Sequence, residues 1–308
     1  MNRVSGVLAA ALVLTGAAFG QFPSPLLTET SAKISGHIYE TTGFPNVVYV
    51  IGDNATLVVD TGLGPANGAV VARVAKRLSK GPKLFLTTTH YHPEHAAGLG
   101  GFPPDTTLIR PSVQQQELEK EGEQTMTFFR NSPQFGPSLQ GLAPLRPPDV
   151  TFDDEAKLDL GGGVTVRLMF LGAGHTASDE LIFVEPDKAL ITGDIVQNKV
   201  VPAVASSGGS FTSWLTVLNK LVPLQPRIVV PTHSKAGDAS LITAEAAFIR
   251  DFQGRVAALK RSGVSSGDAA KQLTEVFTTA YPEWAANTDW PNVSSMTGFV
   301  NRLYTEAR

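Results

Sequence analysis

The chain has 308 residues, of which 42% are hydrophobic and 17% are charged, and its formal net charge is −3. These values suit one large domain with a sizeable core. The sequence contains no long basic run of the kind that would indicate nucleic-acid binding. The chain contains no cysteine, which excludes disulfides, lipid-modified cysteines and thiolate metal ligands.

The N-terminal residues are typical of a secretory signal peptide. Arg3 supplies a positive charge, and residues 7–19 are mostly apolar but too short to span a bilayer comfortably. Small residues precede Gln21 and mark a cleavage site. We therefore expect a signal peptide over residues 1–20 and a periplasmic or secreted protein with no stable membrane anchor after processing. An uncleaved membrane anchor is the alternative.

The remaining residues, 21–308, are expected to form one domain that ends in helices. Apolar runs and alternating patterns predict strands, whereas apolar residues spaced by three and four predict helices. In the first half, strands are expected at 34–40, 46–52, 55–60 and 83–86, and helices at 65–80 and 112–130. In the second half, strands are expected at 150–152, 164–170, 181–184, 189–192 and 227–230, and helices at 211–221, 239–261 and 266–280. A Pro- and Gly-rich loop is expected over 131–148.

Three histidines follow the predicted strand at 83–86. If the chain stays extended, His90 and His92 point to the same side, because side chains alternate along extended backbone. Pro93 keeps His92 extended and suits the first position of a helix, so Glu94 and His95 would lie in a first helical turn. Two imidazoles on one side and a carboxylate plus an imidazole from the next turn can serve two adjacent metal ions.

Three more candidate ligands follow later strands. His175 comes after the strand at 164–170, Asp194 after 189–192 and His233 after the last predicted strand. Loops held by a rigid scaffold are where binding and catalytic residues concentrate, and histidine is the commonest metal ligand. Five of the six histidines therefore point to a two-metal site. The sixth, His37, has no motif partner nearby and is expected to be an ordinary strand residue.

This ordered set of motifs resembles the metallo-β-lactamase superfamily of metallohydrolases. The resemblance covers roughly residues 35–240 and includes an upstream aspartate motif at 58–62. It implies an α/β fold of the αββα sandwich type. One departure is Glu94, because the family usually has aspartate at that position. The aspartate at position 194 is closer to the lactonase, thioesterase and related branches than to the β-lactamases that use a cysteine ligand there.

The resemblance also implies a role for each motif residue. Asp60 would orient a metal ligand through a hydrogen bond. The residues that would bind metal are His90, His92 and His175 for the first ion, Glu94, His95 and His233 for the second, and Asp194 as a bridge between them.

The predicted function is a zinc-dependent hydrolase that acts on a small molecule. A hydroxide on two zinc ions would attack a carbonyl carbon in an ester, lactone, thioester or β-lactam, and iron or manganese are alternative metals. Asp194 is the candidate residue for moving the proton to the leaving group, and Glu94 is a second catalytic candidate. An iron-dependent oxidoreductase of the same superfamily and a non-catalytic metal-binding protein are the alternatives. The sequence does not define an oligomeric state.

Two further features surround the predicted site. Tyr91 lies between two candidate ligands and points to the opposite side, so a structural role is expected rather than a catalytic one. Met126, Phe128 and Phe129 could line a substrate pocket or lid, and ordinary helix packing is the alternative.

Overall fold

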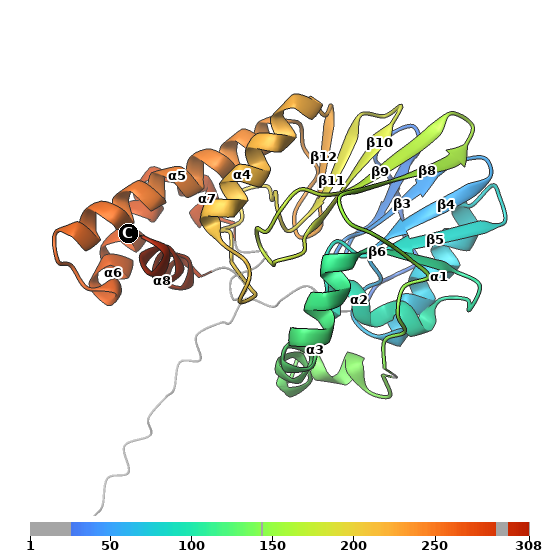
Figure 1. The fold of residues 1–308 in the computed structure, drawn as a ribbon, viewed down its shortest axis with the longest axis horizontal. Helices are drawn as coiled ribbons and strands as arrows, with labels where there is room; N and C mark the ends of the chain where they lie inside the picture. Colours follow the sequence, from blue (N-terminus) through green and yellow to red (C-terminus); the bar gives the residue numbers. More distant parts are fainter. Residues whose placement is uncertain (1–25, 143, 288–294, 308) are drawn as a thin grey trace, which may run out of the picture.

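The computed structural model describes residues 26–142, 144–287 and 295–307. Two β-sheets face each other, and helices cover their outer surfaces (Figure 1). This arrangement confirms the predicted αββα sandwich. The predicted signal peptide lies outside the described residues. Among the described helices, none combines the length and apolar character needed to cross a bilayer.

The first sheet has seven strands that follow one another in chain order. Strands β1 to β4 are antiparallel neighbours, and β4 to β7 are parallel neighbours. Parallel neighbours need a crossover connection, which helices α1 and α3 supply. The elements are β1 (Ala32–Lys33), β2 (Ile38–Thr41), β3 (Val47–Ile51), β4 (Ala55–Val59), α1 (Pro65–Leu78), β5 (Lys83–Thr87), α2 (Pro93–Ala96), η1 (Ala97–Gly101), β6 (Thr107–Pro111), α3 (Ser112–Asn131), η2 (Gly136–Leu139) and β7 (Val150–Phe152).

The second sheet has five strands in the order β12-β11-β10-β9-β8. Strands β8 to β11 form an antiparallel meander, and β12 pairs in parallel with β11 after a helical crossover. The elements are β8 (Glu155–Gly161), β9 (Val164–Phe170), β10 (Glu180–Glu185), β11 (Ala189–Gly193), α4 (Phe211–Leu221), η3 (Val222–Leu224) and β12 (Ile228–Pro231).

Alternation along the strands divides the apolar side chains between layers. In β3, Val48 and Val50 belong to the core between the two sheets. Val47, Tyr49 and Ile51 belong to the core beneath α1. Both faces of this strand are therefore buried, which explains why it is a continuous apolar run and not an alternating one.

The C-terminal helices form a further layer that extends beyond the sheets (Figure 1). Their core is aromatic, and the rings of Phe248 and Trp284 stack with centroids 4.1 Å apart. The helices of this layer are α5 (Ser240–Arg261), α6 (Ser266–Ala280), α7 (Pro282–Ala285) and α8 (Met296–Glu306). The helices expected at 239–261 and 266–280 correspond to α5 and α6, whereas α7 and α8 were not predicted.

The early strand expected at 34–40 was predicted too long. Residues 34–37 form a turn between β1 and β2, and the Nδ1 atom of His37 lies 2.7 Å from an Asp187 carboxylate oxygen. Its place in a turn corrects the expectation of a strand position. This contact holds His37 to the turn between β10 and β11, away from the five other histidines.

Candidate metal centre

The residues after β4 and β5 meet at one edge of the first sheet, because these strands are parallel neighbours. Asp60 directly follows β4 and has a φ of 70°, a left-handed conformation that aspartate accepts more readily than most residues. Its carboxylate accepts hydrogen bonds from the backbone N–H of Thr89 (2.7 Å) and from the Thr89 hydroxyl (3.1 Å). Asp60 thereby fixes the start of the segment that carries three histidines.

The short helix α2 places two of the candidate ligands. His92 has extended geometry immediately before the helix, and Pro93 occupies the first helical position. Glu94 and His95 lie in the helix itself, and both are buried. The local structure is the one that the sequence predicted for this segment.

The second sheet contributes three residues from its own strand ends. His175 follows β9, Asp194 follows β11 and His233 follows β12. Gly193, with a φ of 53°, allows the two sheets to approach closely, because a Cβ atom there would lie 2.7 Å from the Cβ of Thr89. The glycine lets the Asp194 segment pack directly against the segment that precedes His90.

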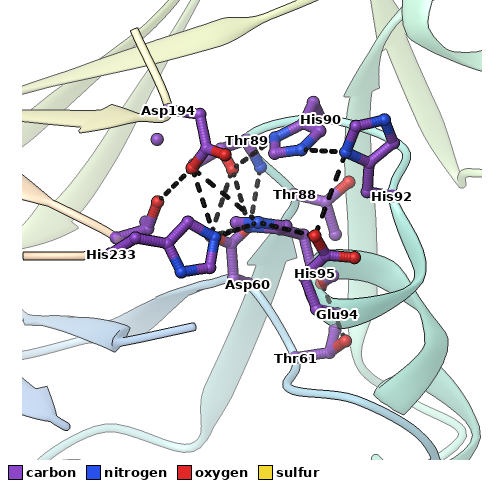
Figure 2. Close-up of polar contacts among 12 residues, drawn as sticks. Asp60, Thr61, Thr88, Thr89, His90, His92, Glu94, His95, Asp194 and His233 are labelled. Carbon is purple, nitrogen blue, oxygen red and sulfur yellow. Dashed lines mark hydrogen bonds and ion pairs between the residues drawn. The ribbon is translucent and has the colours of Figure 1, made fainter. Parts of the chain in front are cut away.

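All seven residues that the sequence singled out as metal ligands come together. Figure 2 shows Asp194 and His233 approaching His95, Glu94 and His90 around one common space. Their nitrogen and oxygen atoms form three overlapping groups in which every atom lies within 4.8 Å of the others. These groups are His90, His92 and His175; His90, His95 and Asp194; and Glu94, His95 and His233.

Three of the distances between these atoms suit zinc. Ligands at about 2.0–2.1 Å from a tetrahedral zinc ion lie about 3.3–3.4 Å from one another. Nε2 of His175 lies 3.4 Å from Nδ1 of His92 and 3.4 Å from an Asp194 oxygen. Nε2 of His233 lies 3.4 Å from the other Asp194 oxygen. Asp194 therefore presents one oxygen toward each side of the site, as a bridging carboxylate would.

Two of the imidazoles are oriented through their second nitrogen. Nδ1 of His95 lies 2.9 Å from a carboxylate oxygen of Asp60. Nδ1 of His175 lies 2.6 Å from the carbonyl oxygen of Ala203, to which it can donate only when it carries the proton. Both contacts leave Nε2 facing the site, and such partners fix the tautomer of metal-binding histidines.

Two residues that the sequence analysis did not identify hold Asp194 in place. The Thr232 hydroxyl donates a hydrogen bond to Asp194 (2.8 Å). The Gln197 amide donates to the backbone carbonyl of Gly193 (3.0 Å) and accepts from the backbone N–H of His233 (3.2 Å). Gln197 thus ties the ends of β11 and β12 together. No motif marks it, because a single glutamine in a loop has no distinctive sequence signal.

The electrostatic environment favours a cation. Burial and then the neighbouring imidazoles hold the pKa values of His90 and His92 well below the ordinary range, which keeps them neutral. Burial raises the pKa of Asp194, but His233, His175 and His95 outweigh it and hold that pKa below its usual range. Burial lowers the pKa of His95, but Asp60 outweighs it and raises the pKa to about 9. The nearby carboxylates that favour a proton on His95 would equally favour a metal ion in its place.

Glu94 gives the clearest test of whether a second ion fits. Burial raises the pKa of its carboxyl group to about 7. One oxygen lies 4.0 Å from Nδ1 of His92 and 4.0 Å from Nε2 of His95, and the other is buried without a hydrogen-bond partner among the described residues. A buried carboxylate oxygen without a partner is costly unless something binds it. The donor set of Glu94, His95 and His233 therefore fits a metal ion.

The remaining predicted features lie around this centre. Tyr91 is buried, and its hydroxyl lies 3.4 Å from the Thr125 hydroxyl on α3. Met126 and Phe129 are buried in an apolar cluster, whereas the side chain of Phe128 is 71% exposed. Packing therefore accounts for Met126 and Phe129.

Comparison with known proteins places the chain in a family. The model of the metallo-beta-lactamase superfamily matches residues 41–233, and the chain belongs to that superfamily. A linear primary-alkylsulfatase from Pseudomonas sp. (strain ATCC 19151) is 25% identical over 210 residues, which are 58% of this chain and 39% of that protein. The chain therefore spans well under half the length of this curated relative.

Solved structures share the fold. A metallo-beta-lactamase from Pontibacter korlensis superposes with a TM-score of 0.58 and 18% identity, covering 73% of this chain and 99% of that chain. The stereoselective inverting sec-alkylsulfatase Pisa1 from Pseudomonas sp. superposes with a TM-score of 0.65 and 14% identity, covering 90% of this chain and 50% of that chain.

Proposed function

We propose that the protein is a metal-dependent hydrolase that holds two zinc ions and acts on a small molecule. The observation that carries this proposal is the convergence of five imidazoles and two carboxylates into three overlapping groups whose ligand atoms lie within 4.8 Å of one another. Family membership adds to it, since the superfamily typically binds a dinuclear metal centre. His90, His92 and His175 would hold one ion, and the other would be held by Glu94, His95 and His233, with Asp194 shared between the two positions.

Zinc at these positions would supply a water molecule of lowered pKa and a Lewis acid for the substrate oxygen. The protein's own residues do the rest of the work. Asp194 is an ionised carboxylate with one oxygen toward each group of histidines, so it can accept a proton between them and return it to a leaving group. Thr232 and Gln197 hold that carboxylate in place, and Asp60 holds His95.

The proposed substrate is a small molecule with a carbonyl bond in an ester, lactone, thioester or β-lactam. A sulfate ester is a second candidate. This candidate is supported by the sequence match to a linear primary-alkylsulfatase. It is also supported by the superposition with the sec-alkylsulfatase structure, which covers 90% of this chain. Both chemistries need an activated water and an oxyanion stabilised by a cation, so the same centre could serve either.

A substrate panel separates these candidates. Zinc-loaded protein should hydrolyse members of a panel of carboxylic esters, lactones, thioesters, β-lactams and alkyl sulfates. Turnover should disappear after chelation and return with zinc. Turnover confined to alkyl sulfates would replace the carbonyl proposal with the second candidate. No metal-dependent turnover on any member of the panel would favour a non-catalytic metal-binding protein.

We expect two metal ions per chain. Seven candidate ligands, one of which is the shared carboxylate of Asp194, motivate this number. Elemental analysis of protein purified without added metal should find zinc, and titration should saturate at two equivalents. Iron as the native metal would favour the oxidoreductase alternative, and saturation at one equivalent would contradict the two-ion site.

We also propose that the protein is exported to the periplasm or secreted. The proposal rests on the apolar run at residues 7–19 and the small residues before Gln21. N-terminal sequencing of the protein from its native host should find a chain that starts near Gln21. Soluble protein that retains Met1 would contradict export.

A further inference from the structure

One face of α3 carries a row of polar residues toward the candidate metal centre. The row consists of Gln114, Glu117, Glu121 and Thr125, which are spaced by three and four residues and therefore share one face of the helix. Gln114 and Glu117 are buried although both are strongly polar. The opposite face carries solvated charges such as Glu123, whose side chain is 83% exposed.

Glu117 reaches the segment that immediately follows His175. One carboxylate oxygen accepts a hydrogen bond from the backbone N–H of Ala177 at 3.0 Å, and the other accepts from the Ser178 hydroxyl. Glu117 therefore holds the backbone of Ala177 and the side chain of Ser178, two and three residues beyond His175.

The same segment is held on its other side by contacts within the second sheet's own loops. Asp179 accepts hydrogen bonds from the backbone N–H groups of Thr176 (2.9 Å) and Gly174 (3.2 Å). The carbonyl of His175 accepts from the backbone N–H of Ala205 (2.8 Å). Glu117, in contrast, reaches this segment from α3, a crossover helix of the first sheet.

The preceding turn of α3 contacts the segment that leads to His90. Gln114 donates a hydrogen bond to the carbonyl of Thr88 (2.8 Å) and accepts one from the Thr88 hydroxyl (2.6 Å). Thr88 lies two residues before His90. Helix α3, which lies beside α2 in Figure 1, thus joins the His90 segment of one sheet to the His175 segment of the other.

We propose that Glu117 is a positioning residue for the metal position formed by His90, His92 and His175. Through Ala177 and Ser178 it holds His175 at the distance from His92 that a shared ion requires. The other metal position depends on Glu94, His95 and His233, none of which Glu117 contacts. This inference rests on the proposed two-metal site.

Zinc affinity in two backgrounds tests the proposal. The His233→Ala background removes a ligand of one metal position and keeps the three-histidine position intact. The His175→Ala background does the reverse. Competition with a chromogenic chelator should show that Glu117→Ala lowers zinc affinity about 10- to 100-fold in the His233→Ala background, the range expected for residues that orient metal ligands. The same change in the His175→Ala background should leave zinc affinity unaltered. Glu123→Ala, on the exposed face of α3, is the matched control and should alter neither.

Two milder variants keep the test decisive if Glu117→Ala does not fold. Glu117→Gln should retain most of the affinity, because its amide can accept from Ala177 and donate to Ser178. Ser178→Ala should lower affinity only at the three-histidine position. Equal losses in both backgrounds, or no loss in either, would overturn the inference while leaving the proposed function intact. A wild-type protein that binds no zinc would overturn both.

Discussion

Replacing Asp194 with alanine is expected to weaken both metal positions and to abolish hydrolysis. The two oxygens of Asp194 lie 3.4 Å from Nε2 of His175 and 3.4 Å from Nε2 of His233, so one side chain serves both sides of the site. Its loss also removes the negative charge that favours a cation at this centre. Zinc affinity at both positions should fall by more than the roughly 10- to 100-fold typical of residues that only orient ligands.

The measurement for Asp194 is zinc titration together with turnover on the best substrate of the panel. Asp194→Asn keeps the shape and one carbonyl oxygen but removes the charge, and it should also lose zinc. Asp105→Ala, at an exposed position, is the matched control and should bind two ions. If Asp194→Ala retained one ion at wild-type affinity, the residue would belong to a single metal position and the bridging role would be wrong.

Replacing Glu94 with alanine is expected to remove one ion and leave the other. Glu94 belongs to the group with His95 and His233, and its buried second oxygen has no hydrogen-bond partner among the described residues. Zinc binding at that position should fall by more than about 100-fold, since a direct ligand matters more than an orienting residue. Titration should then saturate at one equivalent, held by His90, His92 and His175.

The Glu94→Asp variant distinguishes a ligand from a proton carrier. It restores the family's usual carboxylate with a side chain one methylene shorter, and it should retain two ions if Glu94 is a ligand. A Glu94→Ala protein that keeps both ions but loses turnover would show that Glu94 carries protons instead. An unchanged Glu94→Ala protein would remove the residue from the site altogether.

The parts of the fold that the sequence predicted well are those with strong local signals. Helices α4 and α6 have the predicted bounds because each has a clear amphipathic pattern, and Ser210 and Ser265 cap their N-termini. The seven candidate ligands could be found because each follows an apolar strand and because their order along the chain resembles that of the superfamily motifs. The positions of Glu94 and His95 followed from Pro93, which starts α2.

The elements that sequence analysis missed have weak or compensated patterns. Strand β8 lies at the edge of the second sheet. Its exposed charged residues, such as Glu155 and Lys157, alternate with half-buried residues, so its apolar pattern is weak. Strand β6 contains a buried Arg110 and ends in a proline, both of which argue against a strand when read locally. Glu117 acts through Ala177 and Ser178, and Gln197 joins its neighbour Gly193 to the distant His233. Nothing near either residue in the chain reveals the distant partner.

The candidate ligands are divided between the two sheets, and this division has a consequence for unfolding. His90, His92, Glu94 and His95 follow β5, whereas His175, Asp194 and His233 follow strands of the opposite sheet. The chain has no cysteine and therefore no disulfide. A metal ion held between these two groups would cross-link the sheets and close a long loop of the chain. The sheets could then separate only after an ion left one set of ligands. Chelation should therefore accelerate unfolding, even at temperatures where the metal-free sandwich remains folded.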